Sequence, residues 1–142
     1  MTHAIAIDQA HADCTRITFE FFRSLDMRAH DQAVELFTAN GVWERNGKQL
    51  KGHTEIADAL AGRSSERTTF HAVCNPIVLI QGVSRVTRAE VHFFLMAYEA
   101  VAGGKEIIPP AAIRRCVDVL EYDGERWRIA HKSSTRHMPG EA

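Results

Sequence analysis

The order of the patterns along this 142-residue chain predicts an α+β fold, a cone-shaped, curved antiparallel sheet wrapped around N-terminal helices. Helical patterns come first, up to about residue 61, and strands with a period of two follow from about residue 68. The long strands are apolar on both faces, so each face of the sheet needs a cover. If the helices cover the concave face, an apolar pocket is expected between them and the sheet.

The first helix is expected at about Asp8–Met27, where apolar residues recur at spacings of three and four. A second row, Thr18, Phe22 and Asp26, follows at intervals of four and lies beside the buried stripe. Asp26 is therefore expected at the edge of the core, near the end of the helix.

Shorter elements follow. We expect helices at Asp31–Thr38, stopped by Asn40-Gly41, and at Glu55–Ala61, capped by Thr54, with short strands at Val42–Arg45 and Lys48–Gly52. The four long strands are expected at Thr68–Gln81, Arg85–Ala100, Ala111–Tyr122 and Arg126–Thr135, with turns that include Gly82-Val-Ser84.

The strand at Arg85–Ala100 carries apolar residues on both alternations, with Phe93 and Leu95 on one and His92, Phe94 and Met96 on the other. Because the helices can cover only one face, we expect a homodimer or higher oligomer through the outer face.

Composition excludes several classes of protein. With 45% hydrophobic residues and a net charge of −1, the chain is expected to form one domain over 1–142, with its core at about 8–135, and to bind neither nucleic acid nor a membrane. The N-terminus lacks the pattern of a secretory signal, and the three cysteines form no close pair. These observations favour a soluble cytoplasmic protein.

His71 is the candidate with the clearest chemistry. It lies among apolar and small residues on the first long strand, with Asn75 four residues later. A histidine in this position is either a hydrogen-bonded structural residue or a general base. Glu90 and His92 could join it in a metal site, but the sequence has no third spaced ligand, and we expect no metal and no cofactor.

Several motifs occur in an order that resembles the SnoaL-like branch of the NTF2-like superfamily, over roughly residues 8–135. They are Leu25-Asp26, Asp31, Leu36-Phe37, Val42-Trp43, Gly52, Glu55-Ile56, His71, Asn75, Cys116, Asp118, Leu120, Asp123-Gly124, Trp127 and His131. The resemblance implies the NTF2-like α+β barrel, which is the cone described above, and a pocket for a small hydrophobic molecule.

Asp26 and His71 match the aspartate–histidine pair of scytalone dehydratase-like and hexachlorocyclohexane dehydrochlorinase-like members. The resemblance implies that His71 abstracts a proton and Asp26 orients it, in a cofactor-independent lyase or isomerase reaction. It also implies that Lys132 or Arg114 steadies developing negative charge. The residues expected to bind substrate are Phe22, Trp43, Asn75, His92, Phe94, Arg114, Cys116 and Lys132.

The sequence departs from these enzymes at Phe21, Leu25, Arg114 and Cys116, where they carry polar residues that contact substrate. The reaction type is therefore better supported than any substrate. A second hypothesis stays open, a non-catalytic ligand-binding or accessory subunit that resembles the small subunit of ring-hydroxylating dioxygenases. Arg114 could face inward, where it would favour an anionic substrate or pair with Asp118, or it could be an exposed strand charge.

Overall fold

The computed structural model describes residues 6–82 and 86–140. Its helices are α1 (Ile7–Asp26), α2 (His30–Glu35) and α3 (Gly52–Ala61). Its strands are β1 (Phe37–Arg45), β2 (Lys48–Lys51), β3 (Arg67–Gln81), β4 (Arg88–Val101), β5 (Ile113–Tyr122) and β6 (Trp127–Met138). Most of the expected Gly82-Val-Ser84 turn, and the expected strand start at Arg85, lie outside the described residues. None of the described helices combines the length and the apolar character needed to cross a membrane.

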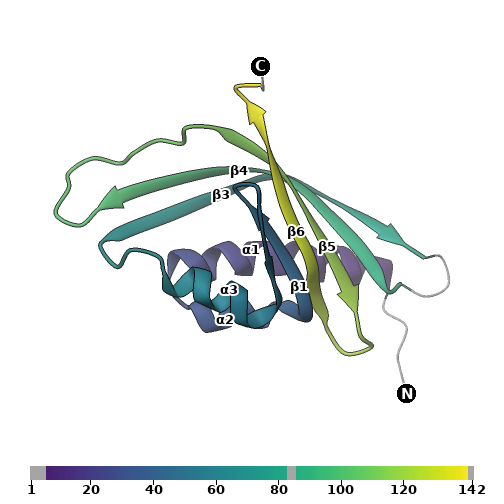
Figure 1. Ribbon diagram of the computed structural model, residues 1–142. Helices are drawn as coiled ribbons and strands as arrows, with labels where there is room; N and C mark the ends of the chain where they lie inside the picture. Colours follow the sequence, from purple (N-terminus) through teal and green to yellow (C-terminus); the bar gives the residue numbers. More distant parts are fainter. Residues whose placement is uncertain (1–5, 83–85, 141–142) are drawn as a thin grey trace.

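The six strands form one open sheet in the order β2-β1-β6-β5-β4-β3, and the sheet bends over the three helices, which gather on its concave side (Figure 1). The predicted α+β class and cone shape are thus confirmed. One detail of the prediction is wrong, because the sheet is mixed: β1 pairs with β6 in parallel, whereas the other neighbours are antiparallel.

The core lies between α1 and the inner face of the sheet. Phe21 of α1 is fully buried and meets the rings of Phe37 and Trp43 edge-on, with centroids 5.7 and 5.2 Å apart. Edge-to-face packing suits aromatic rings because the positive edge of one ring meets the negative face of the other. This cluster fixes the helix against β1.

The expected boundary between the second helix and the first strand is wrong. Helix α2 ends at Glu35 and β1 already begins at Phe37, so Asn40-Gly41 lies inside the strand instead of stopping the helix. A Cβ atom on Gly41 would lie 2.9 Å from the Phe37 ring and 3.0 Å from the Ile129 carbonyl oxygen. Glycine is therefore needed here for the close approach of β6, not to end a helix.

Two other ends differ from expectation. Helix α3 begins at Gly52, with no side-chain cap from Thr54. Strand β6 extends to Met138, which pairs with Ile113 of β5, so the sheet continues beyond the predicted end at Thr135.

Candidate active site

One row of side chains on α1 faces the interior under the sheet. Thr18, Phe22 and Asp26 follow one another at intervals of four, so they point in nearly the same direction. Thr18 donates to the Asp118 carboxylate (2.8 Å), the Phe22 ring lies 5.1 Å from the His71 ring, and Asp26 reaches His71 itself. One face of α1 thus contacts both His71 on β3 and Asp118 on β5.

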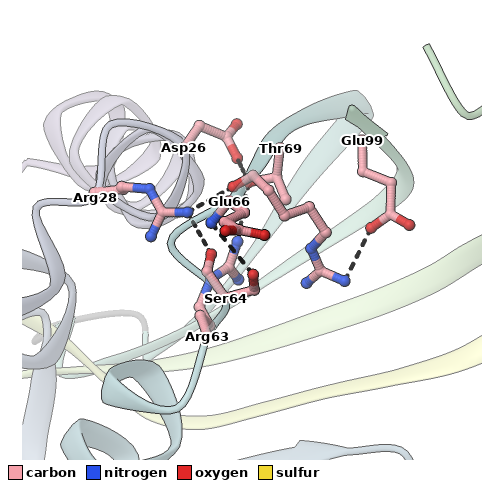
Figure 2. A network of polar contacts seen from close by, with 8 residues as sticks. Asp26, Arg28, Arg63, Ser64, Glu66, Thr69 and Glu99 are labelled. Atoms are coloured by element: carbon pink, nitrogen blue, oxygen red, sulfur yellow. Dashed lines mark hydrogen bonds and ion pairs between the residues drawn. The ribbon is translucent and has the colours of Figure 1, made fainter. Parts of the chain in front are cut away.

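Asp26 is bound to His71 at two points. Its Oδ1 lies 2.6 Å from the ring Nδ1, and its Oδ2 accepts the backbone N–H of His71 at 2.8 Å. The Thr69 hydroxyl donates to the same Oδ1 at 2.9 Å, as Figure 2 shows. Because an ionised carboxylate only accepts, the neutral ring must carry its proton on Nδ1, which leaves the lone pair of Nε2 free.

Burial lowers the pKa of His71 below its usual 6.5, because the charged ring would lose hydration. The hydrogen bond and the charge of Asp26 oppose this shift, whereas the positive charges of Arg63 and Lys132 add to it. His71 is therefore neutral at pH 7, the state in which an imidazole can accept a proton.

A buried ion pair lies deeper in the same interior. Asp118 on β5 and Lys132 on β6 are cross-strand neighbours, 0% and 3% exposed, with Nζ 2.8 and 3.0 Å from the two carboxylate oxygens. The ammonium also lies over the rings of Phe21 and Phe22, 4.3 and 4.5 Å from their centroids. The carboxylate and the two ring faces together offset the desolvation of the lysine.

These groups border a cavity of about 230 Å³ between α1 and the inner face of the sheet. Of the residues predicted for the site, the cavity is lined by Phe22, Trp43, His71, Arg114, Cys116 and Lys132. Asp26 is not part of the wall and lies behind His71. The volume is below the ~300–1,000 Å³ common for drug-sized ligands, so the cavity suits a small molecule.

Three residues expected in the pocket lie elsewhere, which corrects the prediction. His92 and Phe94 belong to the outer alternation of β4, because Phe93 and Leu95 face the cavity. His92 bonds to Glu90 at 2.9 Å, and Phe94 packs on His137. Asn75 is exposed at a bulge of β3, where its φ of 53° lets the strand shift register.

The alternatives left open for Arg114 are also decided by geometry. Arg114 lines the cavity and donates to the Ser134 hydroxyl at 3.0 Å. It does not pair with Asp118, because four residues of extended strand separate them by about 13 Å. The neighbouring thiol is inert, since burial raises the pKa of Cys116 to about 12 and keeps it protonated.

Within residues 6–82 and 86–140, no three His, Cys, Asp or Glu side chains gather closely enough to hold a metal ion. The metal site considered from the sequence would need Glu90, His92 and His71 to lie together. His71 lines the cavity, whereas Glu90 and His92 lie on the outer face of the sheet.

The model of the SnoaL-like domain family matches residues 9–133. The chain belongs to the SnoaL-like family. Comparison with curated proteins finds no match.

Solved structures agree on the fold of this SnoaL-like chain. An NTF2-like protein with a cystatin-like fold from Novosphingobium aromaticivorans is 14% identical, over 92% of this chain and 83% of its own, with a TM-score of 0.76. A protein of the same organism with the provisional name scytalone dehydratase is 19% identical, over 89% and 83%, with a TM-score of 0.73. Aln2 from a Streptomyces species is 14% identical, over 94% of each chain, with a TM-score of 0.73.

Three polar residues at or behind the cavity wall were not predicted from the sequence. Arg45 and Arg63 line it, and Thr69 stands behind His71. Arg45 could have been found, since it shares the inward alternation of Trp43 on β1. Arg63 follows α3 in a connector, where the sequence has no periodic signal.

Proposed function

We propose that this SnoaL-like protein is a cofactor-independent lyase or isomerase in which His71 abstracts a proton from a small, largely hydrophobic molecule. The observation that carries the proposal is the 2.6 Å contact between Nδ1 of His71 and Asp26, together with the place of the ring in the cavity wall. A neutral imidazole with its second nitrogen facing a cavity has the form of a general base.

In the proposed reaction, Nε2 of His71 takes a proton from a carbon next to a carbonyl group. The electron pair of the broken C–H bond passes into an enolate. The enolate either expels a β-hydroxyl group, which takes the proton from His71 and leaves as water, or receives that proton from His71 at another carbon. The Asp26 carboxylate stabilises the imidazolium that forms. Arg114, bonded to the neutral Ser134, supplies positive charge near the enolate oxygen.

A cytoplasmic location, which the sequence leads us to expect, is also part of the proposal. The three thiols are free in the structure, which suits a reducing compartment.

Proton abstraction can be tested without knowing the natural substrate. The protein is incubated in D₂O with cyclic ketones and β-hydroxyketones, each with and without a carboxyl group, and ¹H NMR follows exchange of the α-proton and loss of water. We expect exchange with at least one compound, and a fall of about 10²-fold or more in His71→Gln. The exchange rate of Asp26→Asn should fall as well, because the His71 ring loses the carboxylate that orients it.

His92→Gln is the matched control, because it removes a histidine from the outer face and should leave the exchange rate unchanged. A rate that survives in His71→Gln, or a panel in which the wild-type protein exchanges no compound, would rule out the proposed chemistry. A stable complex with a large iron-containing subunit would instead favour the accessory role.

A further inference from the structure

Two guanidinium groups lie in the wall of the cavity, one from the last residue of β1 and one from the connector after α3. Arg45 lies over the Trp43 ring, 4.8 Å from its centroid, and Arg63 donates to the Thr69 hydroxyl at 2.9 Å. Both arginines line the same cavity as His71. Neither partner is charged, so each guanidinium keeps its full charge and has N–H donors left over.

The carboxylates near these arginines are engaged by other groups. Glu44 also lines the cavity, but its Oε1 accepts from Gln49 at 2.6 Å and lies 3.3 Å from Nε2 of His131. Glu99 pairs with Arg67 at 3.0 Å. Asp26 is bound by His71 and by Thr69, and Figure 2 shows its contact with Thr69. Among residues 6–82 and 86–140, no carboxylate lies within 4.0 Å of the charged nitrogens of Arg45 or Arg63. With Lys132 paired to Asp118, the cavity wall still carries Arg45, Arg63 and Arg114 against the single carboxylate of Glu44, so positive charge is in excess there.

The two arginines also repel each other. Burial lowers the pKa of Arg63, and the charges of Arg67 and Arg45 lower it further, whereas the Asp26 carboxylate opposes the shift. Burial and the charge of Arg67 also lower the pKa of Arg45. Half-buried guanidinium groups without a direct ion pair are unfavourable, and an anion beside them would relieve both the desolvation and the repulsion.

We propose that the cavity binds a small organic carboxylate, with the carboxylate against Arg45 and Arg63 and the apolar body against Phe22 and Leu95, beside His71. This inference names the substrate class for the proposed function and rests on it for the role of His71. Arginine suits this task because its planar fork matches the two oxygens of a carboxylate. Anchoring of this kind holds the reacting carbon at a fixed distance from the base.

The inference is tested with isosteric pairs of acid and amide, namely phenylacetate, trans-cinnamate and 2-naphthoate against their primary amides. Affinities are measured by titration calorimetry and by NMR at low ionic strength, where surface screening is weak. We expect at least one acid to bind about tenfold more tightly than its amide.

Arg45→Gln and Arg63→Gln should each weaken binding of the acid and leave binding of the amide unchanged. The control is Arg88→Gln, since Arg88 is exposed and pairs with Glu121 away from the cavity. If no acid binds more tightly than its amide, whether both bind equally or neither binds, the inference is overturned. It is equally overturned if the preference survives both substitutions.

The outcome can be separated from that of the proposed function by measuring the same preference in His71→Gln. If His71 is not a base, the exchange experiment fails but the preference for acids remains. If the carboxylate site is wrong, the preference is absent but exchange of neutral ketones persists.

Discussion

Asp26 occupies a position that is unfavourable for a carboxylate in isolation. It is the last residue of α1, where the negative end of the helix dipole repels negative charge. Three donors offset this repulsion, namely the ring and the backbone N–H of His71 and the hydroxyl of Thr69. A carboxylate held in this way can stabilise a charge that forms on the ring, which is the role we propose for Asp26.

The lowered pKa of His71 predicts the pH dependence of the exchange reaction. The rate should rise with pH through the pKa of His71 and reach a plateau below or near pH 6.5, since only the neutral ring accepts a proton. A pH–rate profile of kcat/KM checks this. A rate that instead falls as pH rises through this range would mean that the protonated ring is the active form.

The same shift predicts how stability changes with pH. The unfolded chain binds a proton at His71 more readily than the folded protein. The contribution of His71 to the free energy of unfolding is therefore fully present above pH 6.5 and is lost as the pH falls through the lower pKa of the folded protein. The free energy of unfolding in urea should therefore decrease from pH 7 towards pH 5. His71→Gln should make this decrease smaller.

The buried pair of Asp118 and Lys132 gives a prediction about stability. Lys132→Met would leave the Asp118 carboxylate buried with only Thr18 as a partner, at a cost of about 3–5 kcal/mol. The double variant Asp118→Leu/Lys132→Met removes both charges and should recover much of this loss. Urea unfolding of both proteins measures the difference. If the double variant is no more stable than the single one, the uncompensated charge is not the cause.

At the scale of the element, the bulge in β3 explains why alternation alone was insufficient to assign the faces. Cys74 pairs with Phe94 and Ile77 pairs with His92, so one extra residue changes the phase of the strand between them. Before the bulge His71 faces the cavity, and after it Val78 packs on the core. The pair Asn75-Pro76 was visible in the sequence, but its bulge was not predicted, and Asn75 was assigned to the pocket instead.

The bulge predicts an effect of substitution at Asn75. Asn75→Ala places a Cβ-bearing residue without a local acceptor at a φ of 53°, which should cost about 1 kcal/mol. Asn75→Gly is the matched control and should be neutral or slightly stabilising, because glycine adopts this φ freely. Midpoints of urea unfolding separate the two. Equal destabilisation by both would indicate that the side chain, not the backbone angle, matters at this site.

At the scale of the whole molecule, the order of helices and strands was sufficient to predict the α+β cone, because each element has a distinct period. The contact between Asp26 and His71 was expected only from the resemblance, since no local pattern links residues on α1 and β3. Arg63 was missed for the same reason, because its place in the cavity depends on how the connector after α3 meets β3. Contacts between distant segments are what a single sequence leaves open.

The outer face of the sheet gives the last prediction, that a second copy of the chain covers it. All three helices lie on the concave side, and the outer side exposes Phe70, Ile77 and Leu79 at 61%, 61% and 52%. A hollow of about 450 Å³ beside Phe70 and Tyr98 is lined almost entirely by apolar atoms. Exposed apolar surface of this kind favours a self-complementary contact.

We therefore expect light scattering after gel filtration to give twice the mass of the chain. Phe70→Lys should shift the protein to the monomer, because the charge would be buried at the contact without a partner. Phe19→Lys is the control, since Phe19 on α1 is also an exposed aromatic residue, at 44%, but lies away from the outer face. A monomeric wild-type protein, or a dimer that survives Phe70→Lys, would show that this face is not the interface. The cavity of each protomer lies on the concave side, so its binding of acids should not change in the monomer.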